Sequence, residues 1–293
     1  MANKFYNPGE PRAAKVSDLF ATVARRYDLM NDLQSFGLHR VWKRRLVRMA
    51  NARPGEQALD VCCGTGDIAF ALARCGASVA GLDFSEPMLA VAEGRRRRRR
   101  GRRGQGAEAL AGRAPNPRFV KGDAQQIPFP ENTFEIVTVG YGLRNLADWK
   151  TGLREMQRVA KPGGRLLVLD FGKPDNSLWR GIYFGYLKFL VPVLGGMVCG
   201  NSSAYAYILE SLMHYPAQRG VASGMLELGL TGVRVLNLLG GIMSINYGEK
   251  PDHDRESSLR AACEDTGRTE RPVAASDFES RCQAGTGWTR MPS

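Results

Sequence analysis

The segment Leu59-Asp60-Val61-Cys62-Cys63-Gly64-Thr65-Gly66-Asp67 decides the fold of this 293-residue chain. It places a glycine-rich turn between a short apolar run, Ala58–Val61, and a helical pattern that begins near Ile68. Glycines let the backbone turn sharply and approach a ligand, and the first N–H groups of the helix face that ligand. The spacing Gly64-x-Gly66-x-x-Ala69 also satisfies the dinucleotide fingerprint, so the motif alone leaves open a dinucleotide site and a strand-to-helix turn without ligand.

Short apolar runs alternate with helical stretches from Gln57 to Asp170. Strands separated by helices form right-handed βαβ units in a parallel sheet, and two later runs around Gly240-Gly241 are typical of a hairpin. The expected strands are Ala58–Val61, Ser78–Leu82, Arg118–Val120, Ile136–Val139, Arg165–Leu169, Val233–Leu239 and Ile242–Tyr247. We therefore expect an α/β fold with a mostly parallel, seven-stranded, Rossmann-like sheet, helices on both faces and a C-terminal β-hairpin.

Composition divides the chain into three segments. Residues 1–50 are predicted to be helical and basic, residues 51–250 carry the α/β pattern, and residues 251–293 are expected to be a disordered tail because they contain few large apolar residues. Within the second segment, residues 94–117 are rich in Arg, Gly and Ala and are expected to form a long low-complexity loop. Arg95–Arg103 holds eight arginines and supplies two thirds of the net charge of +12, so the basic character belongs mainly to this insertion.

The sequence also indicates the compartment. The first ten residues lack the apolar core of a secretory signal, and no window has the ~18 apolar residues of a membrane-spanning helix. The six cysteines have no regular spacing and include no C-x-x-C pair that would suggest zinc. We expect a reduced, cytoplasmic protein without a metal site.

Polar residues follow the expected strands at the edge where parallel sheets bind ligands. Asp83 ends the second strand, where a carboxylate can accept both hydroxyl groups of a ribose. Asp123 and Ala124 follow the third strand, where a side chain and a backbone N–H can bind an adenine edge. This order, followed by Lys161-Pro162-Gly163-Gly164-Arg165 before a strong strand, resembles class I S-adenosylmethionine-dependent methyltransferases. A dehydrogenase would need a second, substrate-binding domain, for which the remaining chain is too short.

Longer motifs narrow the resemblance to the menaquinone/ubiquinone biosynthesis C-methyltransferase family, over about Lys15 to Lys250. The motifs are Lys15-Val-Ser-Asp-Leu-Phe, Tyr27-Asp28-Leu-Met-Asn31-Asp32, Ser35-Phe-Gly-Leu-His39, Pro128-Phe-Pro-Glu-Asn-Thr-Phe134, Gly142-Leu143-Arg144-Asn145, Lys161-Pro-Gly-Gly-Arg165 and Leu239-Gly-Gly-Ile-Met-Ser-Ile. The resemblance implies methyl transfer from S-adenosylmethionine to a ring carbon of a polyprenylated hydroquinone. It favours demethylmenaquinol as the acceptor and leaves the benzoquinol of the ubiquinone pathway as a further substrate.

The resemblance carries a cofactor site onto this sequence. The positions that match family residues holding S-adenosylmethionine are Thr65, Asp83, Asp123 and Ala124, and we assign Gly64, Gly66 and Gly140 to the same site. Relatives often have serine at position 140, so Gly140 implies the loss of one side-chain hydroxyl contact.

The acceptor site is expected after the fourth strand. A hydroquinone carbon becomes nucleophilic when a neighbouring hydroxyl group ionises, and the charge of Arg144 could stabilise that ionised ring. The resemblance supports Arg144 and Asn145 as acceptor-site residues. An ordinary ion pair between Arg144 and an acid such as Asp148 is the alternative.

Three N-terminal residues have two interpretations each. Tyr27 and Asp28 could complete a polar network at the acceptor, with Asp28 as a proton acceptor. Alternatively, Tyr27 packs and Asp28 caps a helix or pairs with Arg25 or Arg26. His39 could act as a base or make a structural hydrogen bond. The sequence leaves these alternatives open.

A lipid-soluble acceptor predicts contact with a membrane. Leu178–Met213 would cover the prenyl chain, and the Arg95–Arg103 run would add electrostatic attraction during transient contact at the inner face of the membrane. A competing hypothesis is an RNA methyltransferase whose arginines bind phosphates. We expect no specific nucleic acid, because the run lacks interleaved aromatic residues and the chain lacks an Asn/Asp-Pro-Pro-Tyr motif. A noncatalytic S-adenosylmethionine-binding protein is a third reading, and a homodimer is compatible with the sequence.

Overall fold

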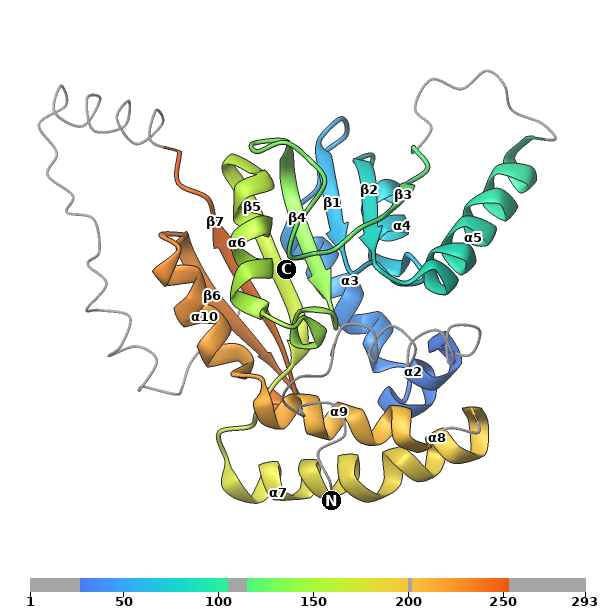
Figure 1. Cartoon of the computed structure of the whole chain (residues 1–293), viewed down its shortest axis with the longest axis vertical. Coiled ribbons are helices and arrows are strands. Elements are labelled where there is room, and N and C mark those ends of the chain that lie inside the picture. The colour runs from blue at the N-terminus through green and yellow to red at the C-terminus, as the bar shows by residue number, and fades with distance from the viewer. Residues whose placement is uncertain (1–26, 105–114, 200–201, 253–293) are drawn as a thin grey trace, which may run out of the picture. The chain divides into compact units, whose positions relative to one another are not determined.

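A seven-stranded sheet organises the protein (Figure 1). In the computed structural model the strands are β1 (Gln57–Val61), β2 (Ser78–Asp83), β3 (Arg118–Lys121), β4 (Phe134–Gly140), β5 (Ala160–Phe171), β6 (Thr231–Leu238) and β7 (Met243–Glu249). Their order is β3-β2-β1-β4-β5-β7-β6. Neighbours among β1 to β5 are parallel, whereas β7 is antiparallel to both β5 and β6. The predicted α/β fold with a C-terminal hairpin is confirmed, and each predicted strand overlaps an observed one.

The structure describes residues 27–104, 115–199 and 202–252. The described residues up to Pro251 belong to one compact unit. The helical pattern expected before Tyr27, the middle of the predicted arginine-rich loop and nearly all of the expected tail lie outside the described residues. The division of the chain at residues 50 and 250 stays a prediction.

The described helices cover both faces of the sheet and the carboxyl ends of its parallel strands. They are α2 (Tyr27–Ser35), α3 (Leu38–Ala50), α4 (Asp67–Arg74), α5 (Glu86–Gly104), α6 (Trp149–Val159), α7 (Ser177–Gly185), α8 (Val191–Cys199), α9 (Ser202–His214) and α10 (Ala217–Glu227), with a π-helical turn η2 (Tyr186–Leu190) and the 3-10 turns η1 (Leu143–Asn145) and η3 (Leu239–Gly241). Successive strand side chains point to opposite faces, so Ile136 packs with α3 and α4 while Val137 packs with α6 and α10. Both faces of the central strands are therefore buried.

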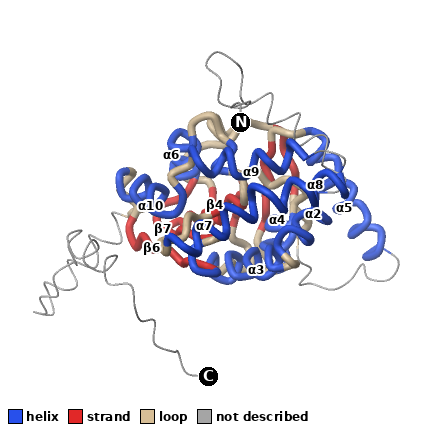
Figure 2. Tube along the Cα trace, turned by 90° about the horizontal axis from the view of Figure 1, so that it is seen from below, coloured by secondary structure: helices blue, strands red, loops and turns tan. Residues whose placement is uncertain are grey.

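The helices α7, α8 and α9 form a separate layer. They lie across the carboxyl ends of the parallel strands, with α2 beside them, and Figure 2 views the molecule from this side. The buried side chains of Met30, Leu187, Val191 and Ile208 join this layer to the main core. This layer lies over the sheet edge where the sequence places the ligand-binding residues.

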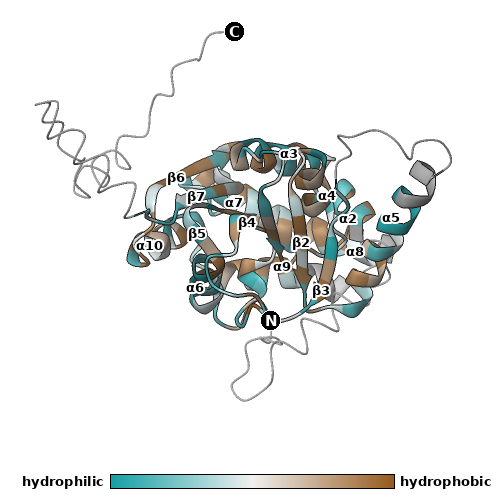
Figure 3. Cartoon of the chain, turned by 90° about the horizontal axis from the view of Figure 1, so that it is seen from above, coloured by the Kyte–Doolittle hydropathy of each residue, from teal (hydrophilic) through white to brown (hydrophobic). Residues whose placement is uncertain are grey.

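The arginine-rich segment is helical at its start, which corrects the predicted loop over residues 94–117. The helix α5 continues through the arginines to Gly104, and Figure 3 shows a ribbon that changes from partly hydrophobic in its first turns to hydrophilic further along. Arginine has a high helix propensity, so a charge run after an apolar helical turn can continue the helix. The loop prediction assumed that all of the arginines are solvated, and it missed the contacts of the first arginine, Arg95.

Arg95 ties α5 to the glycine-rich turn. Its guanidinium donates to the carbonyl oxygen of Thr65 at 3.0 Å, to Asp28 at 3.2 Å and to Asp67 at 2.7 Å. Lys43 of α3 donates to the other Asp67 oxygen at 2.7 Å, and the Thr65 hydroxyl donates to Asp28 at 2.9 Å. Burial opposes ionisation of Asp67, but Lys43 and Arg95 outweigh it and hold the pKa of that carboxyl well below its usual range. These five residues, the Asp67 network, join α2, α3, α4 and α5.

We expect the substitution Arg95→Ala to destabilise the protein, because it removes three hydrogen bonds and leaves Asp67 with one cation. The expected loss in the free energy of unfolding is about 1–3 kcal/mol, measured by urea denaturation. The matched control is Arg97→Ala, which removes the same charge from an exposed position of the same helix. The control should change stability by less than about 0.5 kcal/mol. Equal stabilities for the two variants would contradict the tethering role of Arg95.

Candidate functional site

The turn after β1 has a backbone that few residues other than glycine adopt. Gly64 and Gly66 have φ values of +54° and +86°, and Gly66 is the N-cap of α4. A Cβ atom on Gly66 would lie 2.8 Å from the ring of Phe119, so neither the conformation nor the space permits a side chain. Cys62 also has a positive φ, +52°, which stores backbone strain at the start of the turn. The turn is thus held in one shape.

Asp83 fixes the same turn from the end of β2. One carboxylate oxygen accepts a hydrogen bond from the backbone N–H of Gly64 at 2.7 Å, and the other accepts from Ser85 at 2.9 Å. Burial raises the pKa of Asp83, and the backbone donors oppose that shift. Each carboxylate oxygen keeps a second lone pair, so the Asp83 carboxylate can still accept hydrogen bonds from two ribose hydroxyl groups.

Five of the seven predicted cofactor residues meet around one cavity of about 130 Å³, the cofactor cavity. These residues are Gly64, Asp83, Asp123, Ala124 and Gly140. Thr65 lines a smaller neighbouring cavity of about 30 Å³, and Gly66 lines neither. At the cofactor cavity, the buried side-chain oxygen of Asn145 has no hydrogen-bond partner among the described atoms. An unpartnered acceptor and the Asp83 carboxylate at one cavity fit a ligand with hydroxyl and amine donors, such as S-adenosylmethionine.

Two further residues of this region were missed by sequence reasoning. Asp60 is buried near the end of β1, where it accepts hydrogen bonds from Thr138 at 2.9 Å and from the Ala69 N–H at 3.0 Å, and burial raises its pKa to about 7. Tyr141 follows β4 with φ +62°. It lines the cofactor cavity, its smaller neighbour and a third, larger cavity that is described below. An acid inside an otherwise apolar strand was a signal for Asp60. Nothing in the sequence singled out Tyr141.

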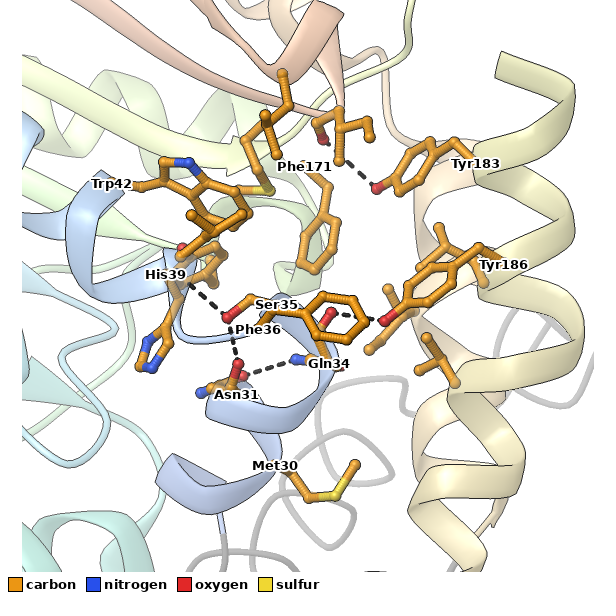
Figure 4. A pocket seen from close by; sticks show the side chains of 18 of the residues that line it. Met30, Asn31, Gln34, Ser35, Phe36, His39, Trp42, Phe171, Tyr183 and Tyr186 are labelled. Atoms are coloured by element: carbon orange, nitrogen blue, oxygen red, sulfur yellow. Dashed lines mark hydrogen bonds between the residues drawn. The ribbon is translucent and has the colours of Figure 1, made fainter. Parts of the chain in front are cut away.

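A larger cavity of about 350 Å³, the acceptor cavity, adjoins the cofactor cavity at Tyr141. One wall comes from α2 and α3 and carries Asn31, His39 and Trp42, and Tyr183 and Tyr186 stand opposite on α7 and η2 (Figure 4). The cavity is mostly apolar and aromatic, with a few polar side chains from α2, α3 and η1. This composition suits a flat apolar ring that carries a small number of polar substituents.

Arg144 lines the acceptor cavity but is already paired. Its guanidinium donates to Asp170 at 2.7 Å and to the carbonyl oxygen of Tyr141 at 2.7 Å, and it lies 4.5 Å from the ring centroid of Phe171. Both members of the ion pair are buried. Arg144 thus forms an ion pair, but with Asp170 rather than with the local acid Asp148, which instead caps α6. The negative charge of Asp170 partly offsets the positive charge of Arg144 at the cavity.

The other residues predicted for the acceptor site do not all lie at the acceptor cavity. Asn145 lines the cofactor cavity rather than the acceptor cavity and donates to the Tyr141 carbonyl oxygen at 3.0 Å. Asp28 belongs to the Asp67 network and is not among the described residues that line the acceptor cavity. Tyr27 begins α2, and its side chain lies outside the described part of the chain. His39 lines the acceptor cavity. The catalytic roles assigned from the sequence stay predictions.

We expect Asp83→Ala to lower the affinity for S-adenosylmethionine by about 10²-fold or more, because two charge-assisted hydrogen bonds to the ribose are lost. Titration calorimetry measures the affinity, and circular dichroism checks that the variant is folded. Glu86→Ala is the control, since it removes an exposed carboxylate three residues away. Unchanged affinity in a folded Asp83→Ala variant would remove Asp83 from the cofactor site.

Comparisons with known proteins agree with this geometry. The sequence model of the ubiE/COQ5 methyltransferase family matches residues 10–250. The demethylmenaquinone methyltransferase of Desulfitobacterium hafniense is 39% identical over 249 residues, which cover 83% of this chain and 92% of that protein. The ubiquinone/menaquinone biosynthesis C-methyltransferase UbiE of Cellvibrio japonicus is 40% identical over 249 residues, covering 83% and 94%.

Solved structures share the fold. A SAM-dependent methyltransferase from Aquifex aeolicus has a TM-score of 0.50 at 16% identity, covering 82% of this chain and 99% of that one. The [4+2]-cyclase SpnF has a TM-score of 0.54 at 16% identity, covering 83% and 98%, so the fold alone does not define the reaction. The family match over most of the sequence does define the reaction. The chain belongs to the ubiE/COQ5 methyltransferase family and is an S-adenosylmethionine-dependent methyltransferase.

Proposed function

We propose that this protein methylates a ring carbon of a polyprenylated hydroquinone, with demethylmenaquinol as its main acceptor. The observation that carries the proposal is the apolar acceptor cavity, which adjoins the cofactor cavity and shares Tyr141 with it. On this proposal a ring in the larger cavity meets, beside Tyr141, a methyl group presented from the smaller one. The names of the relatives, which mention demethylmenaquinone and ubiquinone/menaquinone, support this choice of acceptor.

The dimensions of the site also support a hydroquinone. A volume of about 350 Å³ lies in the range of pockets that hold a small organic molecule. Trp42, Phe171 and Tyr183 supply aromatic surface for a fused ring. Exposed apolar side chains on α7 and η2 continue the apolar surface beyond the cavity, where a prenyl chain can follow. We assign the naphthoquinol as the favoured ring and the benzoquinol as a second substrate.

The cofactor and the protein contribute different parts of the reaction. Bound S-adenosylmethionine supplies a methyl group on a positively charged sulfur. The protein must bind the ring beside that methyl group, favour ionisation of a ring hydroxyl and exclude water from the reacting carbon. Arg144 lines the cavity and, with its charge reduced by Asp170, is proposed to orient a ring oxygen. Asp83, at the other end of the site, is proposed to anchor the ribose.

A lipid-soluble acceptor needs access from a bilayer, and we propose that the protein contacts an anionic membrane surface transiently. None of the described helices is both long enough and apolar enough to cross a membrane. The helical run α7-η2-α8 instead exposes a stripe of large apolar side chains, including Phe189 at 66% and Met197 at 71% exposure. Lys188 lies exposed beside Phe189, with its ammonium 5.2 Å from that ring, and can interact with lipid phosphates.

We expect the double substitution Ile182→Ser and Phe189→Ser to weaken binding to vesicles of anionic phospholipid, because it removes apolar area from the stripe. Co-sedimentation with vesicles at low and physiological salt measures the effect. Leu226→Ser, at an exposed apolar position on α10, is the control and should bind as the wild type does. If the double variant binds vesicles normally but becomes monomeric in analytical ultracentrifugation, the stripe is an interface between two copies and the membrane assignment is wrong.

The proposed reaction requires the reduced ring, since a quinone has no hydroxyl group to ionise. We expect transfer of a labelled methyl group to demethylmenaquinol under anaerobic, reducing conditions and only background transfer to the oxidised compound. A demethylated benzoquinol tests the second substrate, and tRNA tests the nucleic-acid alternative, for which we expect no transfer. Equal rates on quinol and quinone, or methylation of RNA alone, would overturn the proposal.

A further inference from the structure

The acceptor cavity opens to solvent between apolar side chains. Among the described residues that line the cavity, the exposed ones are Phe36, Trp179, Ile182 and Leu239, which we call the cavity rim. All four are large and apolar, whereas the charged lining residue Arg144 is buried. An exposed apolar patch at the opening of a cavity is typical of a site that binds an apolar ligand.

The turn that carries Phe36 is an unusual helix end. The N–H of Gly37 donates to the carbonyl oxygen of Asp32 at 2.8 Å, and the N–H of Phe36 donates to that of Leu33 at 3.3 Å, the two hydrogen bonds of a Schellman cap. In this cap the position of Phe36 has a left-handed backbone, here with φ +50°, and is usually glycine. Phenylalanine strains that backbone and leaves a ring that is 78% exposed to water. Both features cost the free protein stability.

The turn between β6 and β7 has the same pattern. Leu239 has a φ of +47°, and the residue after it, Gly240, also lies in the left-handed region. The side chain of Leu239 is 51% exposed. A bulky apolar residue with a left-handed backbone is uncommon, and strained residues of this kind gather at functional sites. Phe36 and Leu239 come from turns far apart in the sequence, yet both line the acceptor cavity.

Hydrogen bonds join the elements that carry the rim. The indole N–H of Trp179 on α7 donates to the carbonyl oxygen of Leu239 at 3.0 Å. The hydroxyl group of Tyr186 donates to the carbonyl oxygen of Gln34 in the last turn of α2 at 2.7 Å. In Figure 4 the ring of Phe36 projects from the turn after α2 toward the wall that carries Tyr186. The two turns are thus each fastened to the α7–η2 wall of the cavity.

The size of the cavity indicates what the rim binds. A volume of about 350 Å³ suits a molecule the size of the ring, but not a long isoprenoid chain in addition. The chain of a polyprenylated acceptor must therefore leave the cavity past its exposed lining. Since the exposed lining among the described residues is apolar, it can shield the first part of such a chain from water.

We propose that Phe36, Ile182 and Leu239 bind the first isoprene units of the acceptor where its chain leaves the cavity; this inference rests on the proposed function. The two strained turns hold apolar side chains at the opening, where they would otherwise only be exposed to water. These contacts do not involve the reacting carbon. They contribute mainly to KM and make the protein prefer acceptors that carry a chain.

Phe36→Gly is the decisive variant, because it removes the ring and suits the left-handed backbone. The acceptors are 1,4-naphthohydroquinone with and without a geranyl chain at carbon 2, both assayed without vesicles. In kcat/KM we expect the wild type to favour the geranyl compound by about 30-fold or more, and the variant to reduce this preference by about fivefold or more, mainly through KM. The melting temperature of the variant should stay within about 3 °C of the wild type or rise, because the strain is relieved.

Three further variants test whether the effect belongs to the rim. Leu239→Asn keeps a residue that tolerates the left-handed region but makes it polar, and it should reduce the preference for the chain in the same way. Phe36→Tyr retains the ring and should retain most of the preference. Val41→Ser is the control, because Val41 is exposed and apolar on α3 but is not among the described residues that line the cavity. It should leave the preference unchanged.

A binding measurement separates the rim from methyl transfer. Quinones quench tryptophan fluorescence, and Trp179 belongs to the rim, so the oxidised compounds report their own binding without turnover. We expect Phe36→Gly to weaken binding of the geranyl quinone more than binding of the chainless quinone, by about fivefold or more.

The outcomes separate the two proposals. A wild type that methylates neither quinol would refute the proposed function. A wild type that methylates them, beside folded Phe36→Gly and Leu239→Asn variants with an unchanged preference for the chain in turnover and in binding, would refute the rim assignment alone. If these variants keep that preference but lose binding to anionic vesicles, the rim is a membrane anchor and the assignment to the chain is wrong.

Discussion

Asp67 holds the site together, because one carboxylate binds cations from two helices that are distant in the sequence. Lys43 of α3 occupies one oxygen and Arg95 of α5 the other, while Arg95 also reaches the Thr65 carbonyl oxygen. The glycine-rich turn would otherwise be a short stretch with several residues in the left-handed region. With Asp67 in place, α3 is fixed against the turn, and α3 carries the wall of the acceptor cavity. The geometry of the acceptor cavity thus depends on an ion pair outside it.

The acceptor cavity combines apolar walls with a charge that is already balanced. Arg144, the one Lys, Arg, Asp or Glu among the described residues that line it, is paired with Asp170. A buried charge without a partner would be costly and would attract water, whereas paired charges leave the cavity close to neutral. Such a cavity can accept an apolar hydroquinone and still respond when a charge develops on its oxygen.

Much of the fold could be predicted from the sequence because its signals are local. The alternation of apolar runs, helical stretches and Gly240-Gly241 specified the strands to within a few residues, apart from the early start of β5. Asp83, Asp123 and Ala124 were predictable as site residues because they follow strands whose carboxyl ends share one edge of the sheet.

The contacts between distant segments could not be predicted in the same way. The arginine run was interpreted as a loop, because only the fold shows that Arg95 lies beside Thr65 and Asp67. Asp170 as the partner of Arg144 follows from the adjacency of β4 and β5, which the strand pattern alone does not give. The acceptor cavity requires α2 and α3 to face α7 and η2. The residue spacing within one helix does not predict which other helices it faces.

The position of Tyr141 has a consequence for how the protein can vary. Tyr141 lines both the acceptor and the cofactor cavity, and its backbone has a φ of +62° that restricts which residues fit. A replacement that enlarges the acceptor side also reshapes the donor side. Acceptor preference is therefore more readily altered at the far wall, on α7 and η2, where a changed side chain meets only one of the two ligands.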